Sequence, residues 1–284
     1  MKGLPLVLAL ATWLFACARS SEPPVETRAA DTRIESEIQV SLAGSPRLDK
    51  EKARDVFRHP RETLEFFGLR DDMHVVELWA PDGYYTSILA PVLRDHGKLG
   101  VTFMDPGGDF AGQPQAKKWQ TEASQRFLAR LDKNPEVYDR VNRIVMKPPV
   151  FSFGDDGTAD LVVTFRNIHN WIPEGYEDAV FAAAFRALRP GGVLGVVEHR
   201  GQPGMTRKQI EDTGYVPEDV VVALATKAGF RLSARSEINA NPKDTKDYPD
   251  GVWTLPPIYA LKEKDHAKYE AIGESDRMTL KFIR

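Results

Sequence analysis

Cysteine is almost absent from this chain of 284 residues, in which Cys17 is the single example. An intrachain disulfide is therefore excluded, and folding in an oxidising compartment raises no pairing problem. A basic excess is also missing, because 38 Lys and Arg residues stand against 41 Asp and Glu, so nucleic acid is not an expected partner. The sequence has no HExxH motif, no paired Cys or His at ligand spacing and no GxSxG motif. We therefore predict neither a metal site nor a serine nucleophile.

A membrane-spanning apolar run is lacking as well, which decides how the N-terminus is interpreted. Lys2 precedes the run GLPLVLALATWLFA, which is shorter than the ~18–20 residues that span a bilayer, so residues 1–16 are predicted to be a secretory signal. The junction LFAC at 14–17 resembles a bacterial lipobox and predicts lipidation of Cys17; an ordinary secretory signal is the alternative. Acyl chains would hold the protein on a membrane. Ala18, by resemblance to sorted lipoproteins, favours a periplasm-facing position at the outer membrane.

Residues 17–45 are rich in Ser, Pro, Glu and Thr and show no sustained apolar periodicity. We expect them to form a lipidated N-terminus and flexible tether, followed by one domain over residues 46–284. In that domain, helical stretches alternate with short valine-rich runs typical of parallel strands covered on both faces. The expected strands are 74–79, 98–104, 160–165, 192–199, 230–238 and 277–283, and the expected helices are 45–68 (broken at Pro60 and capped by Gly68), 84–96, 115–133, 176–189 and 217–229. This alternation predicts an α/β fold, a doubly wound Rossmann-like sheet with an antiparallel strand at its end.

Ligands of open α/β sheets bind beyond the carboxyl ends of the strands, so the segments that follow the expected strands are candidate site residues. Asp105 stands where nucleotide-binding folds hydrogen-bond ribose hydroxyls, or else it caps a turn. The stretch RNIHNW at 166–171 gathers polar and aromatic side chains, which favours a site over a simple cap. His169 or His199 could accept a proton near neutral pH, and a hydrogen-bonded structural histidine is the alternative for each. The turn-rich stretch 239–257 predicts an ordered loop that packs back over the domain as a lid.

Several segments of the chain resemble predicted class I S-adenosylmethionine-dependent methyltransferases of bacteria, closest to an exported branch. They are VVELW…GYYTSILAPVL, DLVVTFRNIHNW, ALRPGGVLGVVEHR, SEINANPKDTKDYPDGVWTLPP and SDRMTLKF. The resemblance runs from about Arg54 to the C-terminus. It implies a seven-stranded sheet whose last hairpin is antiparallel, S-adenosyl-L-methionine as cofactor, and a small molecule or envelope component as methyl acceptor. It would place the methionine part of the cofactor against residues 77–83, the ribose at Asp105 and the methyl acceptor near Asn167–Trp171. Together with the strand-end residues above, this predicts cofactor binding by Glu77, Trp79, Asp82, Gly83, Asp105, Arg166 and Asn167, and catalysis by Asn167, His169, Asn170 and His199.

The loop after the first strand departs from the pattern of these enzymes. They generally carry an acid followed by a Gly-x-Gly-x-Gly run, whose glycines let the backbone approach the cofactor at positive φ. Glu77 and Gly83 are present here, but Trp79 replaces the first glycine and Pro81-Asp82 replace later positions. Proline removes a backbone donor and fixes φ. A non-catalytic methyltransferase fold that serves as a ligand-binding or scaffolding lipoprotein is therefore the alternative function, and a dinucleotide-linked enzyme is a more distant one.

Overall fold

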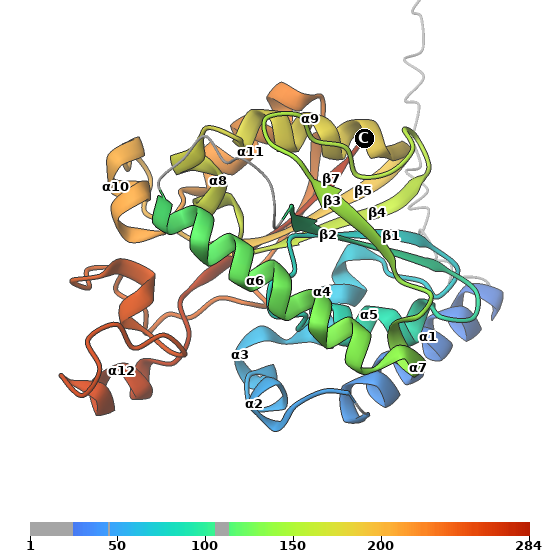
Figure 1. Cartoon of the computed structure of the whole chain (residues 1–284), viewed down its shortest axis with the longest axis horizontal. Coiled ribbons are helices and arrows are strands. Elements are labelled where there is room, and N and C mark those ends of the chain that lie inside the picture. Colours follow the sequence, from blue (N-terminus) through green and yellow to red (C-terminus); the bar gives the residue numbers. More distant parts are fainter. Residues whose placement is uncertain (1–24, 45, 106–113) are drawn as a thin grey trace, which may run out of the picture.

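The computed structural model describes residues 25–44, 46–105 and 114–284. Its middle layer is a seven-stranded sheet with the order β3-β2-β1-β4-β5-β7-β6 (Figure 1). Strands β1 to β5 are parallel, and β7 runs antiparallel between β5 and β6. The predicted doubly wound α/β sheet with an antiparallel last hairpin is thus confirmed. The strands are β1 (His74–Leu78), β2 (Lys98–Met104), β3 (Asn142–Met146), β4 (Ala159–Phe165), β5 (Leu188–His199), β6 (Arg231–Ser236) and β7 (Arg277–Ile283).

Helices cover both faces of the sheet because the central strands are apolar on both sides. Val75 and Val76 are adjacent in β1 and fully buried, yet they belong to opposite core layers, as the two-residue period of a strand requires. The layer of Val75 includes residues of α1 (Val25–Ala43), α4 (Pro60–Phe67) and α5 (Thr86–Leu93). The layer of Val76 includes residues of α8 (Ile168–Glu174), α9 (Glu177–Ala187) and α11 (Glu218–Ala228). The remaining helices are α2 (Asp49–Lys52), α3 (Asp55–Arg58), α6 (Pro114–Lys133), α7 (Pro135–Tyr138), α10 (Arg207–Thr213), the 3₁₀ turn η1 (Gly251–Thr254) and α12 (His266–Ile272).

Strand β3 and the segment 45–68 differ from the sequence-based expectations. β3 pairs with β2 at the edge of the sheet, and Asn142, Arg143 and Val145 are exposed, so this strand has no continuous apolar run that would predict it. The helix expected over 45–68 is divided into α2, α3 and α4. Pro60 is the first residue of α4, where its missing N–H does no harm, and Gly68 ends that helix at φ 82.

Helix α1 shows that the prediction of a tether over residues 17–45 is wrong for Val25–Ala43. Ile34 and Ile38 are buried in the layer that also contains α4 and α5, and Ser41 Oγ donates a hydrogen bond to the carbonyl of Ile88 at 3.0 Å. Two isoleucines four residues apart are enough to bury one stripe of a helix, and so short a pattern does not show as sustained periodicity. The folded domain therefore includes α1 and does not begin at residue 46.

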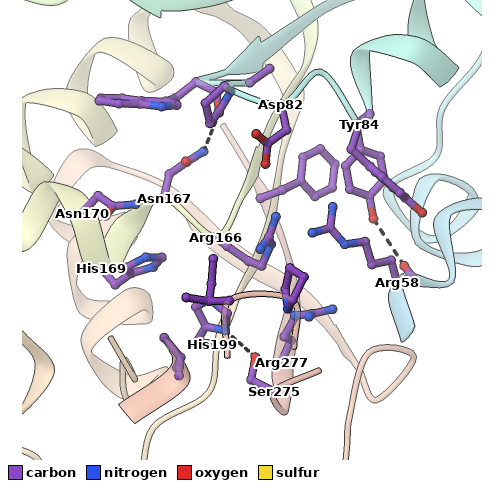
Figure 2. Close-up of a pocket in the computed structure, with 18 of the residues that line it drawn as sticks. Arg58, Asp82, Tyr84, Arg166, Asn167, His169, Asn170, His199, Ser275 and Arg277 are labelled. Atoms are coloured by element: carbon purple, nitrogen blue, oxygen red, sulfur yellow. Dashed lines mark hydrogen bonds between the residues drawn. The ribbon is translucent and has the colours of Figure 1, made fainter. Parts of the chain in front are cut away.

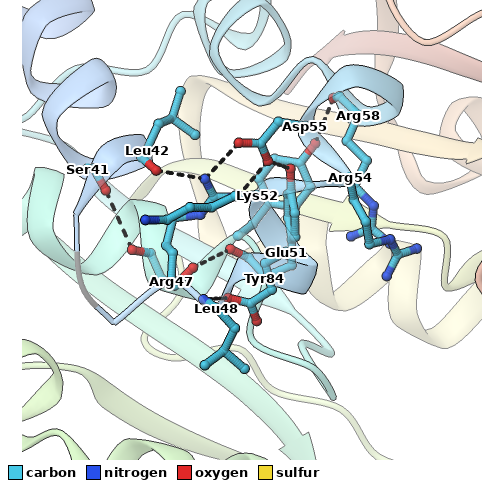
Figure 3. A network of polar contacts seen from close by, with 12 residues as sticks. Ser41, Leu42, Arg47, Leu48, Glu51, Lys52, Arg54, Asp55, Arg58 and Tyr84 are labelled. Carbon is cyan, nitrogen blue, oxygen red and sulfur yellow. Dashed lines mark hydrogen bonds and ion pairs between the residues drawn. The ribbon is translucent and has the colours of Figure 1, made fainter.

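The segment after α1 is attached to the domain by a network of ion pairs (Figure 3). Arg47 donates to both carboxylate oxygens of Asp55, at 2.8 and 2.6 Å, and Asp55 also accepts from the hydroxyl of Tyr84. Glu51 pairs with Arg130 of α6. These contacts bring α2 and α3 against the loop that follows β1, so the N-terminal segment forms part of the wall around that loop.

Three of the sequence-based expectations lie outside the described residues. They are the signal segment 1–16, the lipidation site Cys17 and the residues that directly follow Asp105. Among the described helices, none is both long and apolar enough to cross a membrane.

Candidate active site

A cavity opens at the carboxyl ends of β1, β4 and β5, the edge of the sheet at which the sequence predicts a site (Figure 2). Its walls are the loop after β1, the residues from the end of β4 into α8, the end of α3, the start of β7 and the segment 252–258. The structure therefore brings together residues that are far apart in the sequence. The predicted site residues that line the cavity are Glu77, Trp79, Asp82, Gly83, Arg166, Asn167, His169, Asn170 and His199.

Asp105 is placed differently from the other predicted residues. It follows the last residue of β2, and its amide donates a hydrogen bond to the carbonyl of Met146 at 3.2 Å. It is not among the described residues that line the cavity. Its role at a ribose stays a prediction.

The loop after β1 turns without the glycine run. Trp79 adopts φ 45 and Gly83 adopts φ 66, so the two left-handed positions of the loop fall at its ends. Between them the amide of Gly83 donates to the carbonyl of Ala80 at 3.0 Å and closes a β-turn with Pro81 at its second position, where proline is favoured. The indole of Trp79 stacks on that of Trp119, with ring centroids 6.1 Å apart. The loop therefore has a defined conformation, held at both ends.

Glu77 supplies a buried acid beside this loop. Its side chain is 3% exposed, and Oε2 accepts a hydrogen bond from Thr86 Oγ1 at 2.6 Å. Burial raises the pKa of Glu77 to about 7, against the opposing effects of the Thr86 hydrogen bond and the charge of Arg130. A desolvated carboxylate of this kind would be stabilised by a cationic group of a ligand.

Asn167 joins the ends of β1 and β4 instead of pointing both amide hydrogens at a ligand. Its Nδ2 lies 2.9 Å from the carbonyl of Leu78, 3.2 Å from that of Trp79 and 3.1 Å from Thr164 Oγ1. These contacts hold Trp79 in its left-handed conformation. Asn167 thus positions the loop, and because it also lines the cavity, its contact with cofactor or acceptor stays a prediction.

His169 in the first turn of α8 is oriented by Glu198, the penultimate residue of β5. Nδ1 of His169 lies 3.0 Å from Glu198 Oε1, and the amides of Ile168 and His199 also donate to this carboxylate, at 2.6 and 2.7 Å. Since a carboxylate that accepts amide hydrogens is itself an acceptor, Nδ1 of His169 is the donor in this hydrogen bond. Figure 2 shows the His169 ring at the edge of the cavity, where Nε2 can take a proton.

His199 stands beside His169, with ring centroids 5.0 Å apart. Its Nδ1 is hydrogen-bonded to Ser275 Oγ. Burial, the neighbouring His169 and the guanidinium of Arg277 lower the pKa of His199 well below its ordinary value, so this imidazole is neutral. Two neighbouring imidazoles, tilted 59° to one another, therefore line one wall of the cavity, with the buried carboxylate of Glu198 behind them.

The same three residues have the composition of a metal site. One ligand atom each from His169, Glu198 and His199 lies within 4.8 Å of the others. Both oxygens of Glu198 are already acceptors for backbone amides, however, and one also accepts from His169. The contacts of Glu198 favour its orienting role over metal ligation.

The sequence-based reasoning does not find several residues of the cavity wall, among them Arg58, Trp119, Ser275 and Arg277. A signal for two of them exists in the sequence. Because β7 was expected to be antiparallel, its beginning has to lie at the same edge as the carboxyl ends of β4 and β5. Arg277 is the first residue of β7 and pairs with His199 of β5, and Ser275 lies two residues before it.

The stretch 239–257 is ordered, as expected. Leu255 is fully buried, and Trp253 lies edge-on to His169 with ring centroids 6.2 Å apart. Pro256, Pro257 and Ile258 continue along the rim of the cavity. This segment covers the histidine wall and limits the access of water to it.

Comparison with solved structures identifies the fold. The chain aligns with the [4+2]-cyclase SpnF at a TM-score of 0.50 and 14% identity, over 94% of this chain and 99% of that one. A SAM-dependent methyltransferase from Aquifex aeolicus aligns over 88% and 97% of the two chains (TM-score 0.48, 15% identity). The glycopeptide N-methyltransferase MtfA in complex with S-adenosylhomocysteine aligns over 80% and 89% (TM-score 0.49, 15% identity). No family model matches the sequence, and no curated protein matches it.

The chain has the class I methyltransferase fold. Its strand order, with β7 inserted antiparallel between β5 and β6, is that of the fold. In a methyltransferase fold the cavity described above occupies the switch point between β1 and β4, the position at which open α/β sheets bind their ligands.

Proposed function

We propose that this protein is an S-adenosylmethionine-dependent methyltransferase that acts on a small-molecule or envelope acceptor. The observation that carries the proposal is the cavity itself. It is bounded by the loop after β1 with the acid Glu77 on one side, and by a proton acceptor, His169, oriented by Glu198, on the other. A protein that only binds the cofactor needs the loop after β1 with Glu77. The pair of His169 and Glu198 on the other side is typical of a site for acid–base catalysis.

The residues present fit the cofactor. Glu77 is a desolvated carboxylate suited to a cationic group, and S-adenosylmethionine carries both an ammonium and a sulfonium. Gly83 lies at φ 66, and a Cβ there would come within 3.3 Å of Phe127, so the loop in this conformation favours glycine at position 83. Glu77, Trp79 and Gly83 would hold the methionine part, and Asp105 the ribose. When bound, the cofactor supplies an electrophilic methyl group.

The protein groups have distinct tasks in this proposal. His169 Nε2 takes a proton from the acceptor, and Glu198 keeps Nδ1 protonated so that Nε2 stays available. Neutral His199, hydrogen-bonded to Ser275, orients the acceptor beside it. Trp253 covers the imidazole of His169. We propose further that Cys17 is lipidated, so that the domain works at a membrane surface outside the cytosol.

Calorimetric titration of S-adenosylmethionine and S-adenosylhomocysteine into the full chain tests the proposal. We expect binding in the micromolar range, lost in Gly83→Val, whose side chain would strain φ and displace Phe127 and Arg130. Gly157→Val is the matched control, because Gly157 has φ 72 but lies in open space away from the cavity. It should keep the affinity at a similar cost in stability. No binding to a folded wild-type chain would refute the proposal and favour a non-catalytic ligand-binding lipoprotein.

A further inference from the structure

Four arginines meet around a single carboxylate at one side of the cavity. Glu274 forms ion pairs with Arg54, Arg58 and Arg277. Arg58 and Arg277 are 3% and 2% exposed, and Glu274 is 2% exposed. Buried guanidinium groups are costly unless anions neutralise them, and one carboxylate cannot neutralise this group.

Arg166 adds a further charge with no carboxylate of its own. Within the described part of the chain, no Asp or Glu oxygen lies within 4.0 Å of its guanidinium. Burial and the charges of Arg58 and Arg277 lower the pKa of Arg166 well below its ordinary value. Arg58, Arg166 and Arg277 all line the cavity, so an anion bound among them would offset their mutual repulsion.

Donors in this cluster also lack acceptors. Nη2 of Arg58, although buried, has no hydrogen-bond partner, and neither has Nε of Arg277. Both side chains are nevertheless held in place, since Arg58 stacks over the ring of Tyr84 at 4.4 Å and Arg277 Nη1 donates to the carbonyl of Phe57 at 3.1 Å. Figure 2 shows Arg58, Arg166 and Arg277 converging on the cavity. These buried N–H groups belong to cationic side chains that are held in place, and they have no acceptor. Such an arrangement indicates that an anion binds them.

The backbone of Arg166 supports the same conclusion. Arg166 has φ 60, a left-handed conformation that costs a residue other than glycine on the order of 1 kcal/mol or more. Its amide is fixed by a 2.7 Å hydrogen bond to the carbonyl of Val197. This conformation turns the side chain into the cavity at the end of β4.

We propose that Arg58, Arg166 and Arg277 form an anion-binding site and that the methyl acceptor carries a carboxylate or phosphate group, which these guanidiniums bind. The anion site rests on the arginines alone, and only its assignment to the acceptor rests on the proposed function. Guanidinium groups bind both kinds of oxyanion through paired N–H donors.

The cluster extends along the edge of the sheet from the loop after β1, where Arg58 lies over Tyr84, to the start of β7. Arg166, His199 and Arg277 stand at the same edge on β4, β5 and β7, which are consecutive in the sheet. At about 4.8 Å between neighbouring strands, Arg277 is roughly 14 Å along the sheet from β1, whose loop is expected to hold the methionine part. An anion at Arg166 and Arg277 therefore lies next to His199 and its neighbour His169, where an acceptor has to be.

Binding of inorganic phosphate and of acetate to the full chain, measured by calorimetry at low ionic strength, tests this proposal. We expect affinity for at least one of them to fall on the order of ten- to hundredfold in Arg166→Gln and in Arg58→Gln, as for a lost charge-assisted hydrogen bond. Arg166→Gln leaves no carboxylate unpaired. Arg231→Gln, at the start of β6 and without an ion pair to any residue that the structure describes, is the matched control and should bind as wild type. Unchanged affinity in both cavity variants, or no binding to wild type, would overturn the anion site.

A competition experiment distinguishes an anionic acceptor from the carboxylate of the cofactor. S-adenosylhomocysteine is titrated with and without saturating phosphate, and we expect the same affinity in both. If phosphate displaces S-adenosylhomocysteine, the arginines hold the cofactor carboxylate, and the acceptor assignment is wrong while the proposed function stands. If phosphate binds but S-adenosylhomocysteine does not, the proposed function fails and the acceptor assignment fails with it, while the anion site remains.

Discussion

Replacing Glu77 by glutamine should stabilise the folded chain at neutral and alkaline pH. The carboxyl is 3% exposed, and burial is the main cause that raises its pKa from 4.5 to about 7. Above pH 7 the folded protein has to hold an ionised carboxylate that the unfolded chain would expose to water. Glutamine has nearly the same shape, carries no charge and can accept the hydrogen bond from Thr86 Oγ1.

The size of the effect follows from the two pKa values. A folded pKa about 2.5 above the unfolded one costs about 3 kcal/mol at ~1.36 kcal/mol per pKa unit, once pH exceeds 7. Below pH 4.5 both states are protonated and the cost disappears. Because the raised pKa belongs to an acid, the cost grows as pH rises from 4.5 to 7 and then stays constant. The free energy of unfolding of Glu77→Gln, relative to wild type, should therefore increase by about 2.5 kcal/mol between pH 5 and pH 8.

Urea unfolding of both proteins at pH 5, 6, 7 and 8 measures this difference. Glu274→Gln is the control, in which the free energy of unfolding should fall instead of rise. The guanidinium groups of three arginines lower the pKa of Glu274 despite its burial. The stability from Glu274 is present above its unfolded pKa, so this variant should be less stable than wild type by nearly the same amount throughout this range. A stability difference for Glu77→Gln that does not change with pH would refute the reasoning about Glu77.

Three further predictions concern the helix layer and the histidine wall. Ile38→Ala should lower the free energy of unfolding by about 2–4 kcal/mol, whereas Val40→Ala, at a site 69% exposed on the same helix, should change it by less than ~0.5 kcal/mol in urea unfolding. Glu198→Gln should lower kcat for methyl transfer on the order of a hundredfold with little change in KM, because His169 loses the partner that fixes its proton. Incubation with EDTA should leave the rate at which S-adenosylhomocysteine is formed unchanged. If EDTA lowers this rate and one divalent metal restores it, a metal ion is bound by His169 and His199 instead.

The buried part of the fold could be predicted from the sequence because apolar runs determine it directly. The central strands β1, β4 and β5 are covered on both faces, so each appears as a continuous apolar run. The edge strand β3 and helix α1 could not be predicted in this way. Arg143 and Val145 of β3 face solvent, and α1 is fixed by contacts such as Ile38 against the α5 layer, which only the tertiary structure brings together.

The candidate site likewise contains residues that the sequence predicts and residues that it does not. Glu77 lies near the end of an expected strand and His169 lies four residues after the next one at the site, so the strand list alone places both at one edge. Arg58 and Arg277 are separated by more than two hundred positions in the chain and meet only through the ion pairs of Glu274. Glu198 belongs to an apolar strand, and its role follows from the start of α8 packing over the end of β5. Such residues are determined by topology, which the local sequence does not contain.

The loop after β1 shows why Pro81 and Asp82 are compatible with a working cofactor loop. A glycine run is needed only where φ is positive or where a side chain would collide, and the positive values here fall at Trp79 and Gly83. Pro81 lies between them in a turn that needs no donor from it, and the carbonyl of Asp82 accepts a hydrogen bond from Arg130 at 2.6 Å. Trp79 alone adopts a strained conformation, and the Asn167 and Trp119 contacts stabilise it. The backbone shape of the loop is thus retained with a single glycine, because tertiary contacts hold the position where a second glycine would otherwise be required.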